Sequence, residues 1–438
     1  WRNWCNGGDP LQHHSDVNTE SAPRTEASER KAEDGNADEI IRTAMEHHNA
    51  GRFDLAISGY EEALQRRPDD PELYHLKGVA LSQEGQLEAG IALIRQAVEL
   101  KDDAVDFHNN LGLLLSQAGQ LEAAEQSLRK ALVVKPDHTP AYSNLANVLD
   151  RMGREEDALA AHRTAIEIEP KNSALHGNLG LLLQKTGRTE EAAAILGIAA
   201  ELAPDSPQAH NNFANMLQAT GEFGRAEIEF KHAIELNPNY ANAYQNLGSL
   251  LIEIGRTEEG TQALRKAIEI HPNHAQALAN LSTGLNLLSQ HLDAAAAARR
   301  AIEIAPNLAD AQNNLGAALR ALGDHAGAET AYRRAVALDP AHSKAHSNLI
   351  YSLDFNAAYD VRDHQAERRR WYEQHGKPLA DKFRPHSNSP TAKRRLRVGY
   401  VSSDFRHHSA TNGFGPMLLS YDRSKFDVIC YACNITQD

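Results

Sequence analysis

The stretch TPAYSNLANVLDRMGREEDALAAHRTAIEIEPKN, Thr139–Asn172, holds one complete copy of the 34-residue unit that decides the fold. Tyr142 and Leu145 begin a run of apolar residues at helical spacing, which predicts a first helix with one buried face. Gly153 ends that helix, because glycine adopts a left-handed backbone at little cost. A second apolar run follows, and Pro170 stops it because proline has no N–H to donate. The unit therefore predicts two helices joined by a tight turn.

The same unit recurs along most of the chain. Its turn glycines and its prolines keep the 34-residue period, with Ser289 replacing one glycine and Asp102 replacing one proline. Asparagine stands at one first-helix position of successive units, at Asn110, Asn144, Asn178, Asn212, Asn246, Asn280, Asn314 and Asn348. A fixed period of this length and composition is typical of tetratricopeptide repeats (TPRs). The predicted repeats begin at Ala37, Pro71, Val105, Thr139, Ser173, Pro207, Ala241, Ala275 and Ala309.

These repeats set the expected organisation of the chain. Each repeat buries its apolar face only against its neighbours, so residues 37–342 predict a mainly α, superhelical solenoid of nine repeats with a long concave face. Residues 1–36 are polar, and we expect them to be disordered. Residues 343–392 predict a partial tenth repeat and a helical connector. Residues 393–438 predict the incomplete beginning of a different, α/β domain.

The eighth repeat departs from the common pattern. It has Ser289 at the turn and an unbroken run of alanines over residues 294–298. Ala298 occupies the position that Phe230 and Tyr332 fill in other repeats. Less apolar area is buried there, at a cost of roughly 25 cal/mol for each Å². We therefore expect a weak joint at this repeat.

The asparagines define a row that we call the asparagine ladder. At about 100° per residue, Asn144 lies about 200° from Tyr142, away from the core face of its helix. Asparagine in a helix interior is less favourable than alanine by up to roughly 0.7 kcal/mol, so its recurrence suggests a use. A primary amide has two donors and one acceptor, which suits the backbone of an extended peptide. The ladder therefore predicts a peptide-binding groove for partner proteins.

A second interpretation of the ladder stays open. The repeats could have inherited their asparagines by duplication, with hydrogen bonds to the adjacent repeat as their role. An alanine series along the ladder separates the two interpretations, since the second predicts lower stability with unchanged peptide affinity.

Composition narrows the classes of function. The formal net charge of −14 argues against general nucleic-acid binding. No apolar run approaches the length of a membrane span, and no signal peptide is recognised. Three cysteines in 438 residues fit a reducing compartment, so we expect a cytoplasmic protein. The basic run Lys393, Arg394, Arg395 and Arg397 could mark nuclear import, but such runs more often flank a strand.

No metal or cofactor is expected. Cys430 and Cys433 form a C-x-x-C pair, but no second pair accompanies them, and they fall on a predicted strand. His108, His176, His210 and His346 share one repeat position with Tyr142 and are therefore expected to pack rather than to bind a ligand.

The period changes after Pro390. Leu396–Val401 predicts a buried strand, Gly413–Tyr421 a short helix and Phe426–Cys433 a second strand. This order opens an α/β sheet. Because two strands cannot bury a core of their own, we expect either a domain that is cut off or a fragment that leans on the solenoid.

This end of the chain resembles a known family. The runs LRVGYVSSDFRHH, Leu396–His408, and YDRSKFDVICYA, Tyr421–Ala432, are similar to the start of the catalytic region of protein O-GlcNAc transferases, a glycosyltransferase family that includes the SPINDLY proteins. RRRWYEQHGKPL, Arg368–Leu379, resembles the connector that those enzymes place before catalysis. The asparagine ladder resembles theirs too.

The resemblance implies an enzyme. It implies a GT-B fold with two Rossmann-like lobes that transfers N-acetylglucosamine from UDP-GlcNAc to Ser or Thr of acceptor proteins without a metal. His408 matches the histidine of the family's S-D-F-x-x-H run, which makes it the candidate acceptor-side or proton-relay residue. The lobe that holds most of the donor is expected outside this chain, so the chain as given is expected to be inactive.

Two other functions remain open at this stage. One is a non-catalytic TPR protein-interaction scaffold with a vestigial α/β end. The other is a SPINDLY-type O-fucosyltransferase, because both kinds of transferase resemble this region. The expected partners are acceptor proteins or extended peptides in the groove, and a homodimer through the repeats stays open as well.

Overall fold

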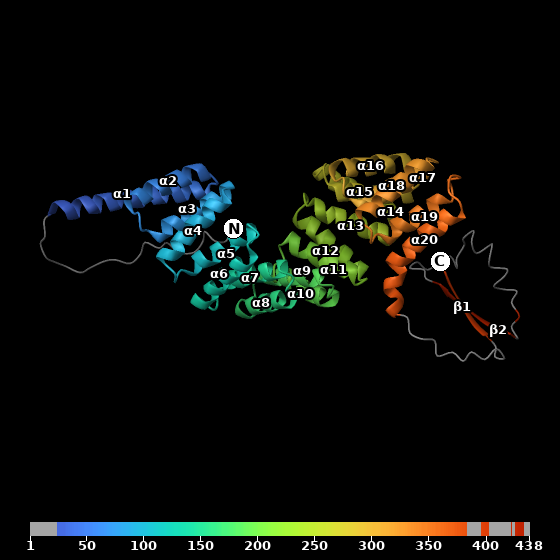
Figure 1. Cartoon of the computed structure of the whole chain (residues 1–438), viewed down its shortest axis with the longest axis horizontal. Coiled ribbons are helices and arrows are strands. Elements are labelled where there is room, and N and C mark those ends of the chain that lie inside the picture. The colour runs from blue at the N-terminus through green and yellow to red at the C-terminus, as the bar shows by residue number, and fades with distance from the viewer. Residues whose placement is uncertain (1–23, 383–395, 403–421, 423–424, 433–438) are drawn as a thin grey trace. The chain divides into compact units, whose positions relative to one another are not determined.

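The computed structural model describes residues 24–382, 396–402, 422 and 425–432. The chain divides into two compact units, unit 1 at Trp1–His364 and unit 2 at Gln365–Asp438. Figure 1 shows that the described part of unit 1 consists of helices that follow one another in chain order.

The helices of unit 1 alternate between the first and the second helix of each repeat. The first helices are α1 (Arg24–Asn49), α3 (Pro71–Glu84), α5 (Val105–Gln117), α7 (Thr139–Arg151), α9 (Ser173–Lys185), α11 (Pro207–Ala219), α13 (Ala241–Glu253), α15 (Ala275–Leu287), α17 (Ala309–Ala321) and α19 (Ser343–Leu353). The second helices are α2 (Phe53–Arg66), α4 (Leu87–Leu100), α6 (Leu121–Val134), α8 (Glu155–Ile168), α10 (Thr189–Leu202), α12 (Phe223–Leu236), α14 (Thr257–Ile270), α16 (His291–Ile304) and α18 (His325–Leu338).

The predicted TPR solenoid is confirmed. From α3 onward, each first helix begins at the residue where the repeat spacing places it. The N-terminal end differs from the prediction, because α1 begins at Arg24 and so runs into the segment that we expected to be disordered. Residues 24–36 are rich in alanine, glutamate, lysine and arginine, which favour helix even without an apolar face. Residues 1–23 lie outside the described part of the chain.

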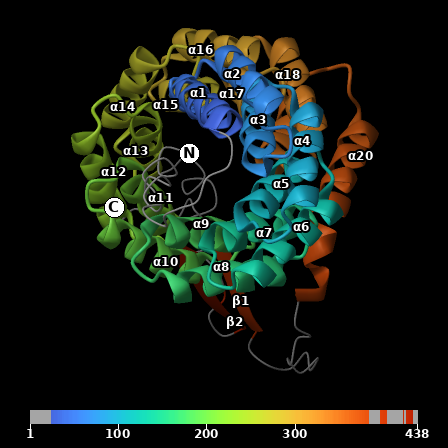
Figure 2. The ribbon, with the colours of Figure 1, turned by 90° about the vertical axis from the view of Figure 1, so that its left-hand side faces the viewer.

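Close helix pairs need small residues at their crossing. A Cβ added to Gly180 on α9 would collide with Leu196 on α10, so this helix pair packs at a distance that only glycine permits. First helices also contact the first helix of the next repeat, as α5 does with α7 and α15 with α17. Figure 2 shows first helices on the inner side of unit 1 and second helices on the outer side. The first helices therefore form the concave face.

Ion pairs connect the second helices on the outer side. Arg154 Nη1 lies 2.9 Å from Glu125 Oε1, and Arg256 Nη1 lies 2.8 Å from Glu227 Oε2. The two pairs stand 102 residues apart, a distance of three repeats, which reveals a longer period superimposed on the basic one. Glu329 continues this series, but Ala358 replaces the arginine that would follow.

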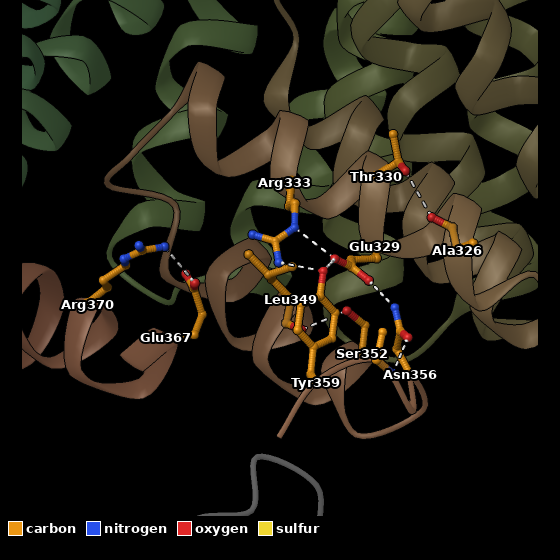
Figure 3. A network of polar contacts seen from close by, with 11 residues as sticks. Ala326, Glu329, Thr330, Arg333, Leu349, Ser352, Asn356, Tyr359, Glu367 and Arg370 are labelled. Atoms are coloured by element: carbon orange, nitrogen blue, oxygen red, sulfur yellow. Dashed lines mark hydrogen bonds and ion pairs between the residues drawn. The ribbon is translucent and has the colours of Figure 1, made fainter. Parts of the chain in front are cut away.

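A polar network takes the place of that arginine at the end of unit 1 (Figure 3). Glu329 accepts hydrogen bonds from Arg333 Nε at 2.9 Å, Tyr359 Oη at 2.5 Å and Asn356 Nδ2 at 3.0 Å. Burial alone would raise the pKa of the Glu329 carboxyl, but these hydrogen bonds outweigh it and hold that pKa below its ordinary value. The network ties the chain after α19 to α18 and closes the solenoid.

The C-terminal segments contain both helical turns and strands. α20 (Val361–Trp371) is followed by a π-helical turn, η2 (Tyr372–Gly376), and a 3-10 helix, η3 (Lys377–Lys382). β1 (Leu396–Ser402) pairs in parallel with β2 (Phe426–Ala432), with Leu396 opposite Phe426. The helix predicted at Gly413–Tyr421 lies outside the described residues.

The fold class needs one correction. The pair β1–β2 is the whole sheet in the described residues, so the start of a GT-B lobe that we expected is not found there. Two strands alone cannot bury a core, and the fold that this structure establishes is the helical TPR solenoid.

The weak joint expected at the eighth repeat remains a prediction, and the backbone at its turn supports it. Ser289 has a φ of 60° and is the one non-glycine residue with positive φ in the part of the chain that is described, a conformation that costs about 1–2 kcal/mol. We predict faster amide hydrogen exchange in residues 294–301 than in the other second helices, because local opening there exposes less apolar surface. Exchange measured by mass spectrometry at equal or slower rates in this segment would contradict the prediction.

Candidate functional site

The asparagine ladder lies on the first helices, one residue for each helix from α5 to α19. Those helices form the concave face, so the ladder follows the groove along unit 1. The amides of these residues are used in different ways. Some bond to the preceding repeat, as the second interpretation of the ladder expected, and others do not.

Three ladder residues bond directly to an asparagine of the preceding repeat. In each pair the ladder amide donates to a carbonyl oxygen 35 residues earlier, and the donor–acceptor distance is 2.9 Å. The pairs are Asn144 Nδ2 with Asn109 Oδ1, Asn246 Nδ2 with Asn211 Oδ1, and Asn348 Nδ2 with Asn313 Oδ1. These bonds connect each of these first helices to the first helix of the preceding repeat.

Two further ladder residues use other acceptors of the preceding repeat. Asn110 Nδ2 donates to His75 Nε2 at 2.9 Å. Asn314 Nδ2 donates to the backbone oxygen of Ala279 at 2.9 Å and to Thr283 Oγ1 at 2.8 Å. For these five residues, hydrogen bonding between repeats gives the asparagine a structural role.

Asn178 and Asn212 behave differently. Asn178 is exposed and Asn212 is half-buried, and neither makes a side-chain hydrogen bond to any described residue. The residue 35 positions earlier explains this for Asn212, because Gly177 has no side chain to accept a bond. A Cβ on Gly177 would meet no atom within 4 Å, so the space beside it is open. The ladder is therefore open at α9 and α11.

Asn280 is an intermediate case. Its Oδ1 accepts a bond from Gln276 Nε2 at 3.1 Å, within the same helix. The residue 35 positions earlier is Gln245, and no hydrogen bond between Gln245 and Asn280 is found in the described structure.

The other predicted site residues give no described site. His408, the candidate catalytic residue, lies outside the described part of the chain, as does Cys433. Among the described residues, no group of three His, Cys, Asp or Glu side chains could hold a metal ion. No described helix is long and apolar enough to cross a membrane.

Comparison with protein families identifies the repeats. The family described as "Cilia and flagella-associated protein 70 C-terminal domain" matches residues 9–236, which is more than half of the chain. The chain belongs to this family. General tetratricopeptide-repeat families match residues 229–262, 246–309 and 309–342. A search of curated protein sequences finds no significant match.

Solved structures with repeats resemble parts of the chain. An O-GlcNAc transferase from Thermobaculum terrenum is 28% identical over 45% of this chain, with a TM-score of 0.40, and the match spans 38% of that protein. YrrB, titled a TPR protein with an unusual peptide-binding site, is 28% identical over 42% of this chain and 95% of its own, with a TM-score of 0.36. PilF from Pseudomonas aeruginosa is 23% identical over 48% of this chain and 96% of its own, with a TM-score of 0.42.

The expected glycosyltransferase activity is wrong. The family that matches more than half of the chain is a TPR family, and the remaining family matches are TPR repeats as well. We therefore withdraw three linked assignments: O-GlcNAc transfer, UDP-GlcNAc as co-substrate and His408 as a catalytic residue. They depended on short runs at Arg368–Leu379, Leu396–His408 and Tyr421–Ala432 and on the asparagine ladder. These features do not specify a catalytic domain. Tetratricopeptide domains bind protein partners, which the non-catalytic alternative had proposed.

The two kinds of ladder asparagine predict opposite effects on stability. Asn144→Ala should lower the free energy of unfolding by about 0.5–1.5 kcal/mol, because it removes a bond between repeats. Asn212→Ala should leave stability unchanged or raise it by up to roughly 0.7 kcal/mol, because alanine is the better helix former. Urea unfolding followed by circular dichroism measures both. Equal losses in the two variants would mean that Asn212 has a structural partner after all.

His75 makes the start of the ladder sensitive to acid. Burial, with a smaller contribution from His48, lowers the pKa of the His75 imidazole from 6.5 to about 4. As pH falls, the unfolded chain therefore protonates His75 before the folded chain does. The contribution of neutral His75 to the free energy of unfolding is complete above pH 6.5 and is lost as pH falls towards 4. Asparagine takes this repeat position at Asn109, Asn211 and Asn313, where it accepts the same bond without titrating.

His75→Asn is therefore a matched variant for the acid effect. Between pH 7 and pH 4, we expect the wild-type chain to lose on the order of 2–3 kcal/mol more stability than the variant. Urea unfolding at a series of pH values tests this expectation. Parallel pH profiles for the two proteins would show that His75 is not protonated on unfolding.

Proposed function

We propose that this chain is a non-catalytic TPR scaffold that binds an extended segment of a partner protein on its concave face. The open part of the asparagine ladder, Asn178 and Asn212, makes the main backbone contacts. The observation that carries the proposal is that these two residues stand on helices of the concave face and make no side-chain hydrogen bond within the described chain. Their neighbours in the ladder are already engaged by the preceding repeat.

The spacing of the open amides suits an extended peptide. Packed helices lie about 8–10 Å apart. An extended chain advances about 3.3 Å for each residue, so amides on α9 and α11 would contact backbone groups about three residues apart. Each amide offers two donors and one acceptor, so it recognises N–H and C=O groups without regard to side chains. Affinity from this source is independent of sequence.

The location of the protein belongs to the same proposal. The description of the matched family refers to a protein of cilia and flagella, and a ciliary partner is proposed on that ground alone. The cytoplasmic or nuclear location expected from the cysteines and the basic run remains a prediction.

Peptide binding provides the direct test of the proposed function. A displayed library of unstructured 12-residue peptides is selected on the full chain, and a labelled binder is titrated by fluorescence anisotropy. We expect Asn178→Ala and Asn212→Ala each to weaken binding by roughly 3- to 10-fold, the range expected for the loss of one or two hydrogen bonds. Asn144→Ala is the matched control and should retain wild-type affinity.

Two results would contradict this function. One is a selection that yields no binder from the library. The other is a binder whose affinity responds to Asn144→Ala as strongly as to Asn178→Ala and Asn212→Ala.

A further inference from the structure

A pocket lies between α7, α8 and α9. Its volume is about 230 Å³, several times the roughly 30 Å³ that one water molecule occupies, so it can hold a large side chain. Its lining residues are Asn147, Asp150, His162, Asn178, Leu181, Leu182 and Lys185. Asn178 is one of the two open ladder residues, so the pocket lies beside the part of the groove that binds the peptide backbone in the proposed function.

His162 from α8 is unusual for its position. The equivalent residues in other repeats are fully buried apolar or aromatic side chains. They are large at Leu128, Leu196, Phe230, Leu264 and Tyr332 and small at Ala298. His162 is only 2% exposed, yet it places a polar ring in this core position. A local departure of this kind is expected at a functional site, because packing alone favours an apolar residue.

The ring of His162 has an unmet hydrogen-bonding group. Its Nδ1 is buried and has no hydrogen-bond partner among the described residues. Burial lowers the pKa of the ring to about 4 despite the nearby Asp150 carboxylate, so the imidazole is neutral at physiological pH. A buried polar atom without a partner costs about 1–3 kcal/mol, a cost that an apolar residue at this core position would not carry. The ring of His162 also lines the pocket, so it can contact an occupant.

The rest of the pocket sets the character of its occupant. Lys185 Nζ lies 2.7 Å from Asp150 Oδ1, so the two charges compensate each other and the pocket favours a neutral group. Leu181 and Leu182 provide apolar surface. An occupant with an apolar body and a neutral polar tip therefore fits better than a charged side chain or a wholly apolar one.

We infer that this pocket binds a tyrosine side chain of the partner segment, a specificity that rests on the proposed peptide-binding function. The aromatic ring of tyrosine contacts the leucines, and its hydroxyl reaches His162 and the amides of Asn147 and Asn178. A hydroxyl both donates and accepts, so it satisfies either tautomer of a neutral imidazole, whereas the indole N–H of tryptophan only donates. Phenylalanine would leave the polar end of the pocket unpaired.

A substitution cycle tests the tyrosine pocket. The library-selected peptide is made with tyrosine and with phenylalanine at its aromatic position, and both are titrated against the wild-type chain and His162→Leu. Leucine already fills this position in other repeats, so the variant is expected to fold, which circular dichroism checks. For the wild type, we expect tyrosine to bind about 3- to 10-fold tighter than phenylalanine. For His162→Leu, the two peptides should bind equally.

The controls separate this inference from the proposed function. Asn144→Ala lies outside the pocket and should keep the wild-type preference for tyrosine. Selected peptides that bind through Asn178 and Asn212 but contain no tyrosine, or that bind equally well with phenylalanine, would overturn the pocket and leave the scaffold intact. A library that yields no binder would overturn both.

Discussion

Each repeat can bury its apolar face only against its neighbours, and the rest of the structure depends on this constraint. It fixes the helix spacing through close contacts such as Gly180 with Leu196, and it places first helices on the inner side of unit 1. A row of residues with the same repeat position then becomes a line along the groove. Residues that recur with the repeat period therefore form a continuous surface on which an extended chain can lie.

The asparagines show how one residue type serves two purposes on that surface. Where the preceding repeat offers an acceptor, as Asn109 does to Asn144, the amide joins two repeats and adds to the packing. Where the preceding repeat offers none, as at Gly177, the amide of Asn212 stays available to a ligand. In one part of the ladder, hydrogen bonds between repeats thus offset the low helix propensity of asparagine. In the other part, the proposed peptide binding offsets it.

The sequence predicted the solenoid well because its period, turn glycines and prolines act locally. It left hydrogen bonds between repeats open as a second role for the ladder. It could not say which asparagines make them, because that depends on the residue 35 positions earlier. Comparing Gly177 with Asn109 and Asn211 would have revealed the gap. His162 in an apolar core position was a second signal that went unused. The glycosyltransferase prediction failed because a short resemblance around His408 outweighed the repeats that make up most of the chain.

The central claim is that the groove binds a peptide where the ladder is open, and closing the ladder tests it most directly. Gly177→Asn would place an amide opposite Asn212, as Asn109 stands opposite Asn144, while Gly177→Ala adds a side chain without an acceptor. The measurement is the affinity of a library-selected peptide for both variants by fluorescence anisotropy. The account predicts weaker binding by Gly177→Asn and unchanged binding by Gly177→Ala. Equal affinity for the two variants would contradict it.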